Sequence, residues 1–139
     1  MVKKSTGASR LTKVAHVGMI VKDINKTMAQ LTPLGIGPFL PMTLHAADAK
    51  RIKISNARIG EVGLELLQPL ERGTVWEKFL AAKGNGIHHL GFMVDNLDEA
   101  LAEMNAAGAE TLLVSRRPTG GIAYVVPKDG GLIIELLQR

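Results

Sequence analysis

The spacing of apolar residues changes along the chain and marks out two similar runs of structure. Residues 15–21 (AHVGMIV) and 88–94 (HHLGFMV) are dense in apolar and β-branched residues, which favours strands. The segments that follow, residues 23–35 and 96–108, carry apolar residues three, four and seven positions apart, which predicts helices. Each predicted helix has a polar N-cap residue and a terminating glycine, namely Asp23 with Gly35 and Asn96 with Gly108.

After each predicted helix the apolar runs become short. They are separated by glycine, proline and asparagine, a pattern typical of strands joined by turns. These runs are residues 49–60 and 61–69 in the first half, and 109–117, 121–127 and 130–139 in the second half. We therefore expect each half of the chain to be a β-α-β-β-β unit.

The chain also repeats its own sequence. A shift of 73 positions places His16 on His89, and the match continues for twenty positions without a gap. A shift of 70 positions superposes two copies of Glu-Leu-Leu-Gln, which begin at Glu65 and Glu135. Repetition of a unit about 50 residues long indicates a tandem duplication. Each copy begins with a histidine on a strand and ends with a glutamate on a strand.

These patterns predict the domain organisation. We expect residues 1–12 to be a flexible basic leader and residues 13–139 to form a single domain. The N-cap spacing of Thr74 and Glu77 and the stop at Gly84 predict a helix between the two copies. In chain order, the domain then consists of module one at residues 14–70, the linker helix at 74–83 and module two at 86–138.

Composition narrows the classes of function. The 139 residues include 46% hydrophobic residues and no cysteine, which favours one cytoplasmic domain without disulfides or thiolate metal sites. The net charge is +4, but Lys3, Lys4, Arg10 and Lys13 lie in or beside the leader, so the remainder is close to neutral. Aromatic residues make up only 4%, too few to stack single-stranded nucleic acid. Without a signal-like or membrane-spanning apolar run, we expect neither a nucleic-acid nor a membrane partner.

Period-2 alternation gives four polar side chains a common orientation. In the strand 88–94, His89 points away from the face that meets the helix, and His16 does so in the first copy. Glu65 and Glu135 take the same orientation in the closing strands. A carboxylate that is buried without a partner costs several kcal/mol, so these acids need compensation. Two imidazoles and two carboxylates suit a divalent ion such as Co, Zn, Mn, Ni or Fe, and we predict that these four residues bind one.

With these motifs the chain resembles the vicinal oxygen chelate (glyoxalase/bleomycin resistance/dioxygenase) superfamily, over residues 14–138. Residues 79–101 (FLAAKGNGIHHLGFMVDNLDEAL) and 127–138 (PKDGGLIIELLQ) are most similar to the methylmalonyl-CoA epimerases. The resemblance implies an α+β fold, with tandem βαβββ modules forming a cup-shaped mixed sheet around a metal site. It also implies that the four ligand positions are those of His16, Glu65, His89 and Glu135.

The resemblance further implies a divalent-metal-dependent epimerase or isomerase, in which the metal stabilises an enolate formed by proton removal next to a carbonyl. We expect a small-molecule substrate, an acyl-CoA thioester or another carbonyl compound. Glu135 is the preferred base, and Glu65 is the candidate for returning a proton to the opposite face. We also expect a homodimer, because small cup-shaped sheets usually have their exposed apolar edges covered.

Other members of the superfamily supply the alternatives. One is a glyoxalase I-type lyase that acts on a thiol adduct of methylglyoxal. An extradiol dioxygenase would use ferrous iron with two histidines and one glutamate; four protein ligands argue against it, although Tyr124 supports it. A metal-free resistance protein that binds a small molecule would use the same cup, but such proteins usually lack the ligand set.

Overall fold

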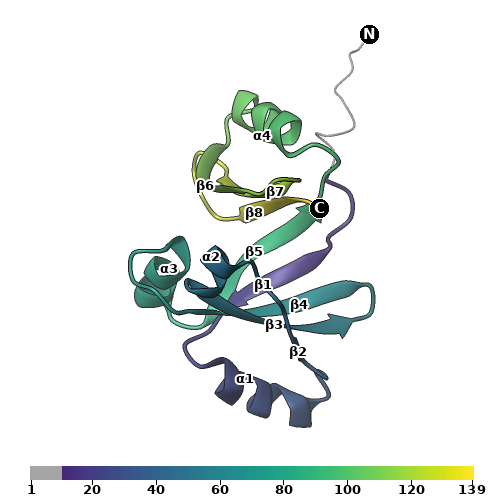
Figure 1. Cartoon of the computed structure of the whole chain (residues 1–139), viewed down its shortest axis with the longest axis vertical. Coiled ribbons are helices and arrows are strands. Elements are labelled where there is room, and N and C mark those ends of the chain that lie inside the picture. The colour runs from purple at the N-terminus through teal and green to yellow at the C-terminus, as the bar shows by residue number, and fades with distance from the viewer. Residues whose placement is uncertain (1–10) are drawn as a thin grey trace. The chain divides into compact units, whose positions relative to one another are not determined.

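The computed structural model describes residues 11–139, and Figure 1 shows the labelled elements. Within these residues the chain forms eight strands, four α-helices and one 3-10 helix. In the first half of the chain the elements are β1 (His16–Ile20), α1 (Ile24–Leu31), η2 (Thr32–Leu34), β2 (Leu40–Pro41), α2 (Ala46–Ala49), β3 (Ile52–Ile59) and β4 (Val62–Pro69). They are followed by α3 (Val75–Lys83), β5 (Gly86–Met93), α4 (Leu97–Ala106), β6 (Glu110–Arg116), β7 (Gly121–Val126) and β8 (Ile133–Gln138).

Strand pairing confirms the predicted fold class. Parallel and antiparallel pairs occur together, so the chain is an α+β protein with mixed strand pairing. The order β-α-β-β-β occurs twice, first from β1 to β4, where the short helix α2 is inserted between β2 and β3, and then from β5 to β8. None of the helices in this described part is long and apolar enough to span a membrane. The first ten residues of the predicted basic leader lie outside the described residues.

The chain divides into two compact units. One consists of His16–His88, and the other of His89–Arg139 together with the segment that ends at Ala15. The strands of the first unit follow the order β2-β3-β4-β1, and those of the second follow β5-β8-β7-β6. In both, the first strand pairs in parallel with the last one, so the duplication seen in the sequence is also a duplication of topology.

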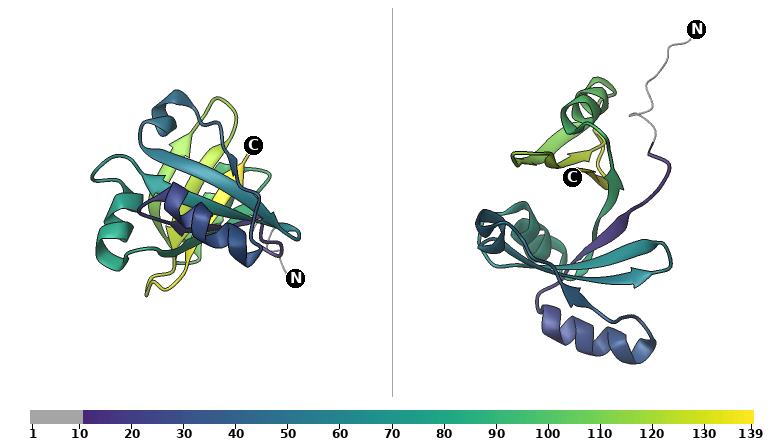
Figure 2. Two further views of the ribbon diagram at one scale, coloured as in Figure 1. Left: turned by 90° about the horizontal axis from the view of Figure 1, so that it is seen from below. Right: turned by 45° about the vertical axis from the view of Figure 1, so that its right-hand side comes forward.

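In the unit His16–His88, helix α1 packs against one face of the strands (Figure 2). The core of this packing is Val21, Ile24 and Leu66, and Leu64 and Met28 lie against it. Leu64 and Leu66 therefore face the helix, as the predicted alternation along this strand requires. Glu65, which lies between them in the sequence, therefore faces the opposite side of the strands.

In the other unit, helix α4 packs against β7 and β8. Its buried core consists of Leu97, Ala100, Ala123 and Leu136. Ile134 packs against this core, so Ile134 and Leu136 face the helix, and Glu135 faces the other side as predicted. Both units therefore present a histidine and a glutamate on the face that is not covered by their own helix.

Both helices begin as the sequence predicts. Asp23 accepts a hydrogen bond from the N–H of Lys26, and Asn96 accepts one from the N–H of Glu99. The first helix differs at its end, because the α-helix stops at Leu31 and continues as the 3-10 helix η2, which contains Pro33. Proline has no N–H to donate to the preceding turn, which explains the change of helix type.

Two short elements add to the predicted set. Strand β2 consists of Leu40–Pro41 and pairs with β3, so that three strands follow helix α1 in module one. Helix α2 covers Ala46–Ala49. The helix predicted between the copies is α3, where the Thr74 hydroxyl accepts a hydrogen bond from the N–H of Glu77.

Candidate metal centre

The first predicted ligand pair lies within the unit His16–His88. Strands β1 and β4 pair in parallel, with His16 opposite Gly63 and Gly18 opposite Glu65. Glu65 is therefore on the neighbouring strand, two positions further along than His16, and on the same face. His16 Nε2 lies 3.6 Å from Glu65 Oε1. His16 is buried and Glu65 is largely buried.

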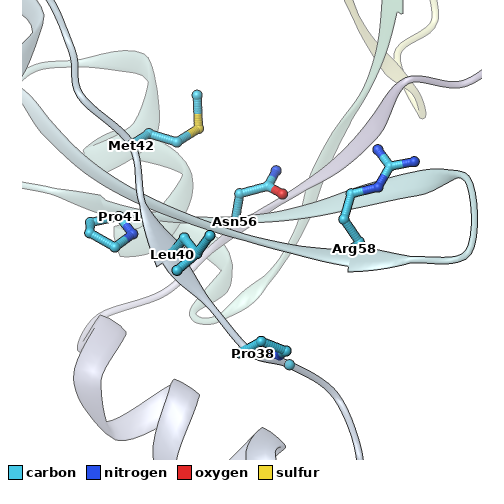
Figure 3. A pocket seen from close by; sticks show the side chains of 7 residues that line it. Pro38, Leu40, Pro41, Met42, Asn56 and Arg58 are labelled. Atoms are coloured by element: carbon cyan, nitrogen blue, oxygen red, sulfur yellow. The ribbon is translucent and has the colours of Figure 1, made fainter.

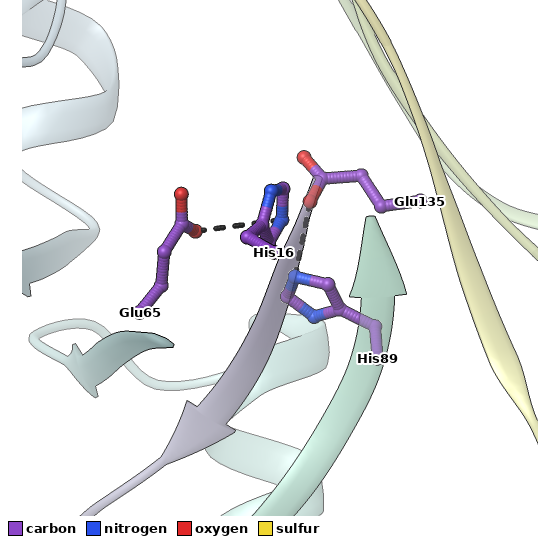
Figure 4. A group of neighbouring side chains, drawn as sticks. All are labelled: His16, Glu65, His89 and Glu135. Carbon is purple, nitrogen blue, oxygen red and sulfur yellow. Dashed lines mark ion pairs between the residues drawn. The ribbon is translucent and has the colours of Figure 1, made fainter. Parts of the chain in front are cut away.

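The second pair repeats this arrangement in the other unit. Strands β5 and β8 pair in parallel, with His89 opposite Ile133 and Gly91 opposite Glu135. The histidine and the glutamate are again two positions apart on neighbouring strands. His89 Nε2 lies 3.0 Å from Glu135 Oε1, and both side chains are buried. Figure 4 draws both pairs, with a dashed line between the nitrogen and the oxygen of each.

The two separations suit ligand atoms of a metal ion. Bonds of about 2.1 Å to one ion place two ligand atoms about 3.0 Å apart at a right angle and about 3.4 Å apart at the tetrahedral angle. The measured separations are 3.0 Å in one pair and 3.6 Å in the other. Neutral imidazole and carboxylate are also the donor types that zinc, cobalt, nickel, manganese and iron accept. This set of histidines and glutamates could therefore bind a divalent metal ion.

Asn56 lies next to the first pair and was not identified from the sequence. It is the cross-strand partner of Glu65 in the antiparallel pairing of β3 and β4, so the two side chains share a face. Its amide nitrogen fills the space above Gly63, where a Cβ atom would lie only 2.9 Å away from it. The same Cβ atom would lie 3.5 Å from the Cβ of His16. Glycine at position 63 thus allows Asn56 to lie beside the pair.

Tyr124 takes the matching position in the second unit. It is the cross-strand partner of Glu135 in the pairing of β7 and β8. Its ring lies 5.0 Å from that of His89, tilted by 36°, and only 1% of the residue is exposed. Tyr124 therefore restricts the orientation of the His89 ring. The sequence drew attention to this tyrosine for another reason, its possible role in a dioxygenase.

His88 belongs to neither pair. Its ring packs edge to face on Phe79 of α3, with 5.0 Å between the ring centres. The adjacent histidines of the His-His motif therefore differ in position, because alternation along β5 sends their side chains to opposite faces.

Comparison with known proteins identifies the family. The family model of the Glyoxalase/Bleomycin resistance protein/Dioxygenase superfamily matches residues 15–125. The chain belongs to this superfamily, as the resemblance in the sequence indicated.

Individual relatives give a finer comparison. The uncharacterized protein YqjC of Bacillus subtilis (strain 168) is 27% identical over 135 residues, which cover 92% of this chain and 93% of YqjC. The human mitochondrial methylmalonyl-CoA epimerase is 26% identical over 136 residues, which cover 92% of this chain and 74% of that protein. The crystal structure of methylmalonyl-CoA epimerase from Mycobacterium tuberculosis has 26% identity and a TM-score of 0.73, covering 92% of this chain and 88% of that one.

Proposed function

We propose that this chain is a divalent-metal-dependent epimerase that removes and returns a proton next to a carbonyl group, with methylmalonyl-CoA as the first substrate to test. The observation that carries the proposal is the repeated pair, a histidine and a glutamate at the same strand register in both modules. Relatives that are methylmalonyl-CoA epimerases support an epimerase-like function. The homodimer and the cytoplasmic location stay predictions from the sequence.

In this proposal both pairs bind the same ion, so that His16, Glu65, His89 and Glu135 supply two nitrogens and two carboxylates. The predicted ions are Co, Zn, Mn, Ni and Fe. Such an ion supplies Lewis-acid stabilisation of the negative charge that develops on a carbonyl oxygen when the neighbouring carbon loses its proton.

The carboxylates are the proposed proton carriers. Glu135 has two oxygens, and Oε1 lies 3.0 Å from His89 Nε2. Its other oxygen can accept the substrate proton at short range, which is the task of a general base. Glu65 occupies the equivalent position in module one and is the candidate for delivering a proton to the opposite face of the same carbon. These two roles use only Glu135 and Glu65. The sequence RIKIS at residues 51–55, which leads into β3, contains no acidic residue that could serve as a further base; its ionisable residues are Arg51 and Lys53.

The test follows the substrate proton directly. Purified protein is incubated with methylmalonyl-CoA in deuterated buffer containing Co²⁺ or Mn²⁺, and deuterium at the α-carbon is measured by NMR. We expect deuterium uptake with inversion of that carbon, and loss of both after removal of the metal with a chelator. The His88→Ala variant is the matched control for His89→Ala, because His88 lies outside the pairs.

Two further measurements on the same protein, turnover of a second substrate and metal content, separate the alternatives. A glyoxalase I-type lyase would leave methylmalonyl-CoA unchanged and would convert the hemithioacetal of methylglyoxal and a thiol. A metal-free resistance protein would retain no ion in elemental analysis and would be inactive towards both compounds. Either result contradicts the proposed epimerase.

A further inference from the structure

A cavity of about 320 Å³ lies beside β2 and β3, within the unit His16–His88. Figure 3 shows its side chains. One part of the lining is apolar and comes from the segment around β2, with Pro38, Leu40, Pro41 and Met42. The other part is polar and comes from β3, with Asn56 and Arg58 extending from the same side of the strand.

Strand register connects this cavity to the ligand pair of the same unit. Leu40 lies opposite Asn56, Asn56 lies opposite Glu65, and Glu65 lies opposite Gly18. The adjacent row joins Arg58 to Gly63 and Gly63 to His16. Neighbouring strands are about 4.8 Å apart, so Asn56 is one strand from Glu65, and the Arg58 backbone is about 10 Å from that of His16.

The residues between the cavity and the pair are small. Gly63 lies between Arg58 and His16, and the space above it is occupied by the Asn56 amide. Gly63 contributes no side chain to this row, so the Asn56 amide is the group that lies over the row between Arg58 and His16. A molecule held at the His16–Glu65 pair can therefore extend along this face towards the cavity.

The Arg58 guanidinium has N–H donors that can bind a ligand. The residue is exposed, and its Nη2 donates to the carbonyl oxygen of Gly60 at 3.3 Å. A guanidinium carries five N–H groups in a planar fork, which matches the oxygens of a carboxylate or a phosphate. The apolar residues opposite it offer contact for methyl or methylene groups.

We propose that this cavity is a specificity subsite for an acyl substrate that carries an anionic oxygen group. Arg58 binds the anionic group, Asn56 donates or accepts a hydrogen bond next to the pair, and the wall of Pro38, Leu40 and Met42 contacts the apolar part. This inference rests on the proposed function, because it takes the reacting end of the substrate to lie at the His16–Glu65 pair. The anionic group is either the carboxylate of the acyl part or a phosphate of the coenzyme A part.

Two ligands distinguish these sources. Isothermal titration measures the binding of methylmalonyl-CoA and of methylmalonyl-pantetheine, which lacks the nucleotide phosphates, to chelator-treated protein. We expect Arg58→Gln to weaken methylmalonyl-CoA binding about 10- to 100-fold, the range of a charge-assisted hydrogen bond. If Arg58 binds a phosphate, methylmalonyl-pantetheine binds equally to both proteins; if it binds the carboxylate, both ligands are weakened. Arg58→Lys retains the charge and should recover part of the affinity.

Arg72→Gln is the matched control, because Arg72 is an exposed arginine of the same unit outside the cavity. Leu40→Ala tests the apolar wall and should weaken the binding of both ligands. Leu40 is 68% exposed, so its removal leaves the core intact. Equal affinities of the parent and Arg58→Gln for both ligands, or no binding by the parent, would overturn the subsite. Failure of the proposed function looks different, because Arg58-dependent binding would then occur without exchange of the α-proton.

Discussion

The side-chain carbonyl oxygen of Gln138 accepts a hydrogen bond from the backbone N–H of Leu97, at 2.7 Å and across 41 positions of the chain. Gln68 makes the same bond to Ile24 at 2.9 Å. Both glutamines close a copy of Glu-Leu-Leu-Gln, and both acceptors meet the first residue of a helix. The repeated tetrapeptide therefore places its glutamate beside a histidine and ties its glutamine to the helix on the other face.

Removal of this bond should destabilise the fold without changing the candidate metal centre. Gln138→Ala leaves the N–H of Leu97 without its acceptor, and we expect a loss of about 1 kcal/mol in the free energy of unfolding. Gln138→Glu is the control, because it keeps an acceptor oxygen and adds a negative charge at a helix N-terminus, where such a charge is favourable. Urea denaturation of the three proteins measures the difference. Equal losses for both variants would show that the hydrogen bond does not stabilise the helix.

Gly63 should tolerate alanine only when Asn56 is shortened. The added Cβ atom would lie 2.9 Å from the Asn56 amide nitrogen, and we expect Gly63→Ala to cost about 1 kcal/mol. In the Asn56→Ala background the same change should cost close to nothing, which a double-mutant cycle of unfolding free energies measures. Gly86→Ala is the control, because its Cβ atom would meet nothing closer than the Phe79 ring at 3.7 Å. An unchanged cost in the Asn56→Ala background would contradict the proposed contact.

The elements that the sequence predicts well are those set by local pattern. The helices α1, α3 and α4 follow from apolar spacing and capping residues, and the orientation of Glu65 and Glu135 follows from alternation along a strand. Strand β2 (Leu40–Pro41) and helix α2 (Ala46–Ala49) were not predicted, because both are too short to show a periodic spacing of apolar residues.

The neighbours of the candidate centre depend on strand pairing, which the sequence does not specify. Asn56, Arg58 and Tyr124 lie on predicted strands, but alternation alone does not reveal that Asn56 faces Glu65 or that Tyr124 faces Glu135. The bonds of Gln68 and Gln138 are equally hidden, because each joins residues more than 40 positions apart. Local pattern thus predicts the ligand types, and tertiary pairing determines what surrounds them.

Metal binding should stabilise the protein through His89 and not through His88. An ion present at 100 times its Kd adds about 2.7 kcal/mol to the free energy of unfolding, which corresponds to a rise in Tm of about 10 °C. His89→Ala should lose most of this rise. His88→Ala should keep it while starting from a lower Tm, because its buried ring packs on Phe79. Thermal unfolding with and without Co²⁺ measures both variants, and an undiminished rise in His89→Ala would exclude His89 as a ligand.

Tyr124 should act on metal affinity by positioning the His89 ring. Tyr124→Leu removes the ring that lies 5.0 Å from the imidazole, and we expect metal affinity to fall about 10- to 100-fold, the usual effect of losing support for a ligand. Tyr124→Phe retains the ring and should retain the affinity. Titration with Co²⁺, followed by its visible absorption, gives the affinity and the geometry of the bound ion. If Tyr124→Phe lost as much affinity as Tyr124→Leu, the hydroxyl group and not the ring would be responsible.

The two glutamates should have separate effects on the two epimers of the substrate. If Glu135 removes the proton from one face of the carbon and Glu65 serves the other, Glu135→Gln strongly slows deuterium uptake into one epimer of methylmalonyl-CoA. In the other epimer, the Glu135→Gln protein should still exchange the α-proton for deuterium slowly, without inversion of the α-carbon. Glu65→Gln should show the reverse preference, and each loss should be about 10²- to 10⁴-fold, the contribution of a general acid or base.

This comparison requires that the variants still bind metal, because glutamine is a weaker ligand than glutamate. Each variant is therefore analysed for bound Co²⁺ before exchange is measured, and Glu110→Gln, a change at an exposed residue of β6, is the control. Because the amide of glutamine cannot accept the proton, a metal-loaded Glu135→Gln protein with normal uptake into both epimers would remove Glu135 from the reaction. Equal loss of uptake into both epimers in both variants would instead indicate that the glutamates act together as ligands, with the proton carried by another group.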